Sequence, residues 1–168
     1  MSSTHNNTLS FFVVEDNDTY IMMLDHQIKK FISDYHLTPF KTGEECLKNL
    51  HLNPDFIILD YFLPGINGIE TLKKIHEQYP DMPVIMWSGQ EDIYVAIECF
   101  EQGAYSYVVK DRNGISKIGR SIGYIQDKIR LRNENEILRT KIKKKQRVIY
   151  GLMLLSLFLL ITLIAVSI

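Results

Sequence analysis

Acidic side chains follow two apolar segments of the chain in a pattern that could assemble a cation site. Glu15 and Asp16 come after an apolar run at residues 11–14, and Asp60 comes directly after a second run at residues 56–59. If these runs are neighbouring strands, which lie about 4.8 Å apart, the three carboxylates converge and raise one another's pKa values. A hard cation such as Mg²⁺ relieves that repulsion, because it takes carboxylate oxygens as ligands and keeps several waters.

Two further polar groups follow two further apolar runs. Ser88 comes after residues 83–87, and Lys110 comes after residues 105–109. A lysine ammonium and a serine hydroxyl can both donate to phosphoryl oxygens. A lone acid or lysine at a strand end is most often a helix cap or a solvated side chain, but here four separate strand ends carry the required groups. Together they predict a site that moves a phosphoryl group.

The elements that must position these groups alternate along the chain between short apolar runs and segments with helical spacing. The predicted strands span residues 11–15, 37–41, 56–59, 83–87 and 105–109, and the predicted helices span residues 17–32, 43–50, 69–79, 91–102 and 115 onwards. Strands that are apolar on both faces predict an α/β protein with a five-stranded, doubly wound parallel sheet. Right-handed crossovers favour the flavodoxin-like (βα)5 order 2-1-3-4-5, whose ligand site lies between strands one and three. Pro39 places the second strand near an edge.

The chain resembles the receiver domains of two-component response regulators. The resemblance covers residues 9–124 and depends on five landmarks that occur in order. They are the acidic pair Glu15-Asp16, the phosphoacceptor segment that runs from Asp60 to Gly68, the pair Ser88-Gly89, the strand-five aromatic Tyr107 and the lysine Lys110.

The resemblance implies that Asp60 is the phosphoacceptor. It would take a phosphoryl group from a phosphohistidine of a histidine kinase or a histidine phosphotransfer protein. Asp16 and Asp60 would bind Mg²⁺ directly, Glu15 would act through water, and the backbone carbonyl of Phe62 would be a further ligand. The chain would not be an enzyme, although it would carry intrinsic Mg²⁺-dependent self-phosphorylation and dephosphorylation chemistry.

The remaining roles concern the phosphorylated state. Ser88 and Lys110 would bind the phosphoryl oxygens, and Ser88 and Tyr107 would form a switch that changes the face made by the fourth helix, fifth strand and fifth helix. Phe62 and Gln90 would flank the approach of hydrolytic water. The family usually has proline after the lysine, and Asp111 stands there instead, so the loop after the fifth strand is expected to differ.

The charge distribution divides the chain. Residues 1–119 hold 9 Lys and Arg against 17 Asp and Glu, residues 120–147 hold 10 against 3, and residues 148–168 hold none. The apolar segment would span about 31 Å as a helix, close to the thickness of a bilayer core. The basic residues before it predict a single-pass anchor with the receiver domain on the cytoplasmic side, as in a bacterial inner membrane. A hydrophobic helix packed on a partner protein is the alternative.

The basic arm has two interpretations that the sequence leaves open. Leu131, Asn135, Leu138 and Ile142 fit d-a-d-a positions of a heptad, which indicates a short coiled coil and a homodimer. The other interpretation is a solvated basic helix that joins the receiver domain to the membrane. We expect no nucleic-acid partner, because the apolar segment explains the neighbouring basic residues better.

The predicted organisation is a disordered segment at 1–8, a receiver domain at 9–124, a basic helical linker at 125–147 and a transmembrane helix at 148–168. The function that fits best is a response regulator which signals at a membrane by phosphorylation-dependent interaction with a downstream protein. A phosphorylation-independent interaction module is the alternative. An enzyme is disfavoured, because a phosphatase would need Asp where Phe62 stands, and Glu15-Asp16 would repel a flavin phosphate.

Overall fold

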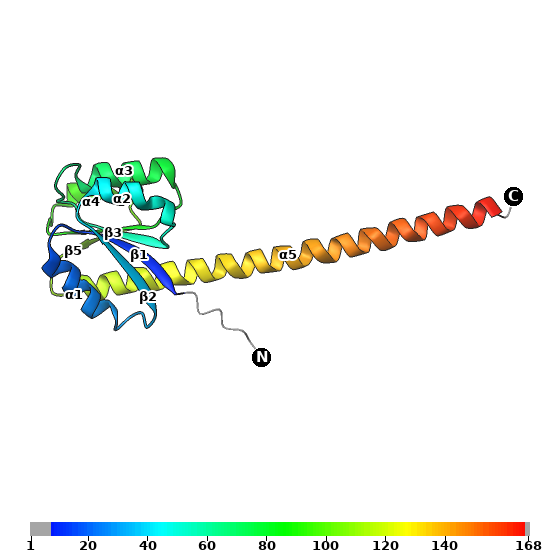
Figure 1. The fold of residues 1–168 in the computed structure, drawn as a ribbon, viewed down its shortest axis with the longest axis horizontal. Helices are drawn as coiled ribbons and strands as arrows, with labels where there is room; N and C mark the ends of the chain where they lie inside the picture. Colours follow the sequence, from blue (N-terminus) through cyan, green and yellow to red (C-terminus); the bar gives the residue numbers. More distant parts are fainter. Residues whose placement is uncertain (1–7, 167–168) are drawn as a thin grey trace. The chain divides into compact units, whose positions relative to one another are not determined.

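The computed structural model describes residues 8–166, with side chains described as far as residue 154 and at residue 156. Five strands and five α-helices alternate (Figure 1). The strands are β1 (Leu9–Val14), β2 (Tyr35–Phe40), β3 (Phe56–Leu59), β4 (Val84–Ser88) and β5 (Ser106–Val109). The helices are α1 (Asp18–Ile28), α2 (Gly43–Asn49), α3 (Gly68–Gln78), α4 (Ile93–Glu101) and α5 (Gly114–Val166), and a short 3₁₀ turn, Leu50–Leu52, follows α2.

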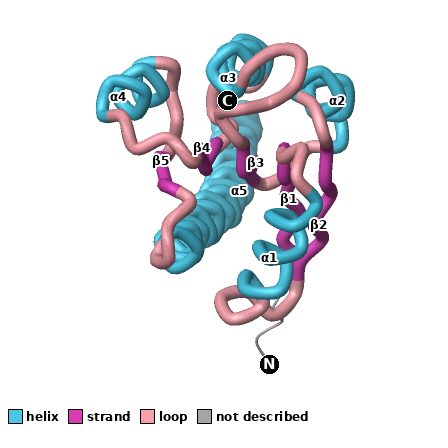
Figure 2. Tube along the Cα trace, turned by 90° about the vertical axis from the view of Figure 1, so that its left-hand side faces the viewer, coloured by secondary structure: helices cyan, strands magenta, loops and turns pink. Residues whose placement is uncertain are grey.

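The sheet is parallel and its strand order is β2-β1-β3-β4-β5. This confirms the predicted topology and places Pro39 on an edge strand. Helices α2, α3 and α4 lie on one side of the sheet, and α1 and the first turns of α5 lie on the other (Figure 2). All four residues of β3 and all five of β4 are buried, as expected of strands covered on both faces.

Helix caps hold the loops at the carboxyl ends of the strands. Asn17 accepts a hydrogen bond from the Thr19 N–H at the start of α1, and Asn67 accepts one from the Glu70 N–H at the start of α3. Both side chains satisfy backbone donors that the first helical turn leaves free. Residues 15–17 join β1 to α1 in a short turn, whereas residues 60–67 form a longer loop between β3 and α3. The caps anchor the far ends of both connections.

Contacts divide the chain into two compact units, residues 1–125 and 126–168. Residues 1–7 of the predicted disordered segment lie outside the described residues, whereas the Thr8 hydroxyl donates to the Asp34 carboxylate over 2.9 Å. In the described part of the chain, no helix is both long enough and apolar enough to cross a membrane. Much of the predicted span, residue 155 and residues 157–168, lies outside the residues whose side chains are described, so the membrane anchor stays a prediction.

Candidate functional site

The three acidic residues singled out in the sequence converge at the carboxyl ends of β1 and β3. Glu15 and Asp16 follow β1, Asp60 follows β3, and one carboxylate oxygen from each lies within 4.8 Å of the other two. The Asp60 N–H donates to the Val14 carbonyl over 2.9 Å, which continues the β1–β3 pairing for one more residue. The pairing of these two strands therefore brings together acids that lie 45 positions apart.

The three acids differ in exposure. Glu15 and Asp60 are buried, whereas Asp16 is exposed. Burial raises the pKa of the Glu15 carboxyl and the pKa of the Asp60 carboxyl, because the charged forms lose water. The ammonium of Lys110 opposes this rise in both cases. The site thus has two buried acids that resist ionisation and one acid that faces the solvent.

Lys110 is the cation of the cluster. Its Nζ lies 2.5 Å from Glu15 Oε2 and 2.9 Å from Asp60 Oδ2, and its side chain is 7% exposed. The Lys110 N–H donates to the Ser88 carbonyl over 2.7 Å, so the β4–β5 pairing fixes the backbone of this lysine. A phosphoryl group on Asp60 would therefore form within reach of a buried ammonium.

Aromatic rings also surround the ammonium, a feature that the sequence did not predict. Lys110 Nζ lies 4.4 Å from the centre of the Tyr20 ring and 5.1 Å from that of Trp87. The two rings pack edge to face at 5.7 Å. Cation–π attraction at these distances restricts the lysine to the site. No spacing in the sequence signals this, because Tyr20 lies on α1 and Trp87 on β4.

Lys41 is a second group that sequence reasoning missed. Its ammonium donates to the Asp16 carbonyl over 3.1 Å and pairs with the Asp18 carboxylate. It follows β2 directly, so it joins the edge strand to the loop that carries Asp16. A positive charge at the last residue of the predicted strand 37–41 is the only signal that could have indicated it.

The predicted switch residues are joined through the backbone of Gln90. The Gln90 N–H donates to Ser88 Oγ over 3.0 Å, and the Tyr107 hydroxyl donates to the Gln90 carbonyl over 2.8 Å. Ser88 is buried and Tyr107 is half-buried. One residue of the loop after β4 thus contacts both, so movement of this loop would reach both side chains.

The loops after β3 and β5 hold the remaining residues. Phe62 is 57% exposed, and its ring packs edge to face against Tyr61 at 4.8 Å. Gly68 closes this loop against the Asp60 backbone, where a Cβ would lie 2.2 Å from the Asp60 carbonyl oxygen. Asp111, which stands in place of the usual proline, pairs with Lys117 at 2.9 Å and accepts from the Asn113 N–H. The Asp111 carboxylate therefore contacts the first turn of α5 and the residue just before it.

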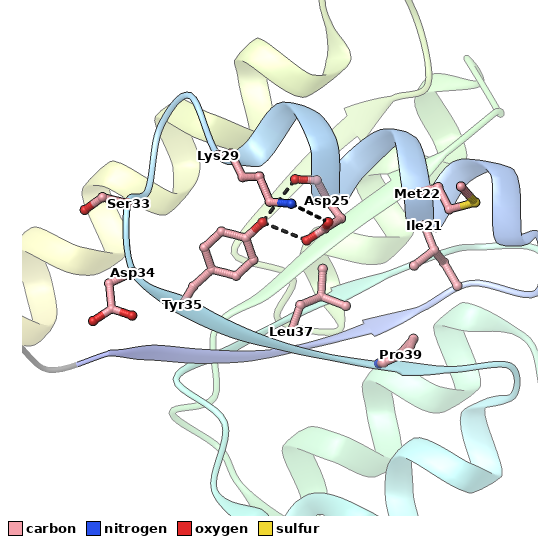
Figure 3. A pocket seen from close by; sticks show the side chains of 9 residues that line it. All are labelled: Ile21, Met22, Asp25, Lys29, Ser33, Asp34, Tyr35, Leu37 and Pro39. Atoms are coloured by element: carbon pink, nitrogen blue, oxygen red, sulfur yellow. Dashed lines mark hydrogen bonds and ion pairs between the residues drawn. The ribbon is translucent and has the colours of Figure 1, made fainter.

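A separate pocket lies between α1 and β2, and none of the three converging acids lines it (Figure 3). The Tyr35 hydroxyl donates to Asp25 Oδ1 over 2.7 Å, and Lys29 pairs with the same carboxylate at 3.0 Å. The hydrogen bond from Tyr35 is the main reason that the pKa of Asp25 is lowered. These contacts fasten the edge strand to α1.

The response regulator receiver domain matches residues 11–117 of the chain. The chain belongs to this family. The chain is 27% identical over 126 residues to the DNA-binding transcriptional regulator NtrC of Klebsiella pneumoniae, a match that covers 73% of this chain. It is also 40% identical over 91 residues to a protein-glutamate methylesterase/protein-glutamine glutaminase of Trichodesmium erythraeum, which covers 52% of this chain. In both cases the match spans 26% of the relative's length.

Solved structures agree on the fold of the receiver domain. A two-component response regulator of the LuxR family from Aurantimonas sp. SI85-9A1 superposes with a TM-score of 0.65 at 20% identity. That match covers 71% of this chain and 86% of the other. Receiver domains bind Mg²⁺ at an acidic pocket, and Glu15, Asp16 and Asp60 form a cluster of acidic residues here.

Proposed function

We propose that this receiver domain accepts a phosphoryl group on Asp60 from a histidine kinase or a histidine phosphotransfer protein. The observation that carries the proposal is the convergence of Glu15, Asp16 and Asp60 beside Lys110. A carboxylate oxygen of Asp60 attacks phosphorus, the P–O bond forms, the P–N bond of the phosphohistidine breaks, and the imidazole nitrogen takes up a proton. The modified residue is thus Asp60 of this chain itself, and later hydrolysis of the aspartyl phosphate releases inorganic phosphate.

The acidic residues fit a magnesium ion. Asp60 Oδ1 is buried and has no hydrogen-bond partner among the described residues. Buried polar atoms normally have a partner, so this oxygen is available to coordinate a cation. Glu15, Asp16 and Asp60 would hold the ion, together with the Phe62 carbonyl. The bound ion would neutralise charge on the phosphoryl oxygens.

The chain's own groups supply the rest of the chemistry. The Lys110 ammonium, already 2.9 Å from Asp60, would move its contact onto a phosphoryl oxygen. The Ser88 hydroxyl would donate to another. Rotation of the Ser88 side chain toward the phosphoryl group would break the hydrogen bond that its Oγ accepts from the Gln90 N–H, and the Tyr107 hydroxyl donates to the carbonyl of the same Gln90. The signal would thus pass from Asp60 to the face of α4, β5 and α5.

Phosphorylation by a small phosphodonor tests this proposal. The full chain, kept in detergent, should take up one acid-stable, base-labile phosphoryl group in Mg²⁺ and none in excess chelator. Asp60→Asn should abolish uptake, and the matched control Asp81→Asn, an exposed acid in the turn before β4, should leave it unchanged. Uptake by Asp60→Asn would refute the assignment of the acceptor. No uptake by the unmodified chain would favour the phosphorylation-independent interaction module.

We further propose that the receiver domain acts at a membrane, on its cytoplasmic side. Residues 148–168 carry no charged side chain, and six basic residues lie within 139–147. Deletion of 148–168 should move the protein from the membrane fraction to the soluble fraction of cells. Leu155→Arg with Leu159→Arg should do the same, because each central arginine opposes insertion by about 2.5–3.5 kcal/mol. Leu155→Ile with Leu159→Ile is the control. Unchanged recovery in membranes after the deletion would rule out the anchor.

A further inference from the structure

The second compact unit, residues 126–168, presents a stripe of apolar side chains to solvent. Leu131, Leu138 and Ile142 are 53%, 55% and 56% exposed, and Ile149 and Leu152 continue the same face into the segment proposed to enter the membrane. These five residues share one face of the helix, with Asn135 and Lys145 in the gaps between them, and an apolar stripe of this kind is expected to be covered by a partner. In the described part of this unit, nothing covers them.

The stripe follows a heptad whose residue types select an oligomer. Ile142 and Ile149 occupy a positions, and Leu131, Leu138 and Leu152 occupy d positions. Isoleucine at a with leucine at d favours two parallel strands, and a single asparagine at a fixes their register. Asn135 occupies such an a position. Lys128 takes one a position and Lys145 one d position, where their aliphatic stems can cover the seam while the ammonium groups reach water.

Charges beside the stripe select the partner and its direction. In a parallel pair of identical helices, each g residue faces the e residue five positions later on the other helix. Here Asp127 would face Arg132, and Glu134 would face Arg139. Both pairs are of opposite sign. In an antiparallel pair g faces g and e faces e. When two such stripes overlap over their full length, Lys141 would face Lys141 of the copy and Arg139 would face Arg139 of the copy, so like charges would meet.

These charged residues are free to change partners. Within one helix, Asp127 pairs with Arg130 at 3.0 Å, and Arg132 lies 3.9 Å from Glu136. Every one of these side chains is more than 60% exposed. Ion pairs so exposed add little stability, so exchanging them for pairs across two helices loses little.

We propose that residues 127–152 form a parallel, in-register, two-stranded coiled coil with a second copy of this chain. The stripe supplies the seam, and the two charged pairs favour the parallel direction over the antiparallel one. The coil would hold two receiver domains together whether or not Asp60 is phosphorylated. This inference is independent of the proposed phosphoryl transfer, because none of its residues belongs to the acid cluster.

Disulfide cross-linking between introduced cysteines tests the geometry. The native Cys46 and Cys99 are free and fully buried, so the unmodified full chain in membranes or detergent gives the background. Leu138→Cys and Ile142→Cys should each form a disulfide-linked dimer on oxidation, and Thr140→Cys, on the opposite side of the helix, should not. Leu131→Cys and Ile149→Cys should also cross-link, because an in-register pair brings every seam position beside its copy.

Three outcomes would overturn the proposal. They are no cross-link at any seam position, equal cross-linking at Thr140→Cys, and cross-linking at only one seam position, which an antiparallel pair would give.

Charge exchange tests the pairing independently. Glu134→Arg would place like charges at two contacts of each dimer and should weaken the dimer about tenfold in sedimentation of the full chain in detergent. Glu134→Arg combined with Arg139→Glu should restore the affinity, because the exchanged pair again has opposite signs. A double variant as weak as the single one would show that these residues do not meet across the dimer.

Discussion

Replacement of Asp60 by asparagine should make the protein more stable at neutral pH, although it abolishes the proposed chemistry. The Asp60 carboxylate is 5% exposed, Oδ2 contacts Lys110 at 2.9 Å, and Oδ1 has no partner in the described part of the chain. The amide has nearly the same shape but no charge. Lys110 would keep its contact with Glu15 at 2.5 Å, so no unpaired buried cation would result.

The expected gain in stability follows from one contribution that favours the Asp60 carboxylate and two that disfavour it. With an effective dielectric constant of about 20, attraction between Asp60 and Lys110 at 2.9 Å is worth about 6 kcal/mol. Repulsion from Glu15, whose carboxylate oxygen lies within 4.8 Å, removes about 3.5 kcal/mol of that. Loss of water from a buried carboxylate costs several kcal/mol and is the largest influence on this group, because the pKa of Asp60 is raised in spite of Lys110. We therefore expect a gain of about 1–2 kcal/mol in the free energy of unfolding.

The pH dependence has a definite sign. A carboxyl whose pKa is raised by folding binds its proton at a higher pH in the folded chain than in the unfolded chain. Its destabilising effect is therefore present at neutral pH and disappears as the pH falls through the raised pKa. The advantage of Asp60→Asn over the unmodified protein should shrink in the same interval.

Denaturant unfolding of the full chain in a non-ionic detergent, with chelator present, measures this difference. Trp87 is the only tryptophan and is buried, so its fluorescence reports unfolding of the receiver domain. Asp16→Asn, an exposed acid of the same cluster, is the matched control and should change the stability by less than about 0.5 kcal/mol. If Asp60→Asn is no more stable than the unmodified protein at neutral pH, or if its advantage is the same in acid, the reasoning from burial is wrong.

Two further predictions concern the loops. The aspartyl phosphate should be long-lived, because the Phe62 ring keeps hydrolytic water away from the phosphorus. Phe62→Ala and Phe62→Asn should therefore speed the decay of the aspartyl phosphate severalfold in Mg²⁺, whereas Phe62→Tyr should not. If decay is unchanged in Phe62→Ala and Phe62→Asn, the ring does not control access of water. The two ring nitrogens of His76 each lie 2.9 Å from a backbone carbonyl, of Met82 and of Gln102. In urea unfolding, His76→Leu should lower the free energy of unfolding by about 1–3 kcal/mol, because both carbonyls lose their partner. His26→Leu, on the exposed side of α1, is the control and should have little effect. Equal losses in the two variants would show that the contacts of His76 with these carbonyls do not stabilise the fold.

Local patterns in the sequence determined the elements of the receiver domain and their order. Four consecutive apolar residues at 56–59 predicted β3 to the residue, because a strand covered on both faces leaves no polar position. Pro39 predicted the edge position of β2, because proline has no backbone N–H to donate to a strand on the outer side of β2. The ends of helices were less well predicted. The predicted helix at 17–32 ends at Ile28, because Lys29 begins a turn rather than another helical repeat.

The acid cluster was predictable for a related reason. In a parallel sheet every strand delivers its next residue to the same edge, so Asp16, Asp60 and Lys110 were expected to converge before any distance was known. The types of residue at the strand ends then indicated the chemistry. The membrane span depends on composition alone, so it remains a statement about the sequence.

Only the tertiary structure decided how these groups meet. The contact between Lys110 and Glu15 joins residues 95 positions apart, and which carboxylate oxygen the ammonium selects depends on the β4–β5 pairing and on the rings of Tyr20 and Trp87. The hydrophobic periodicity of a helix or strand predicts which of its faces is buried, but it does not predict which side chain from another element packs against that face. Partners, burial and the resulting pKa shifts arise when strands and helices from distant parts of the chain pack together.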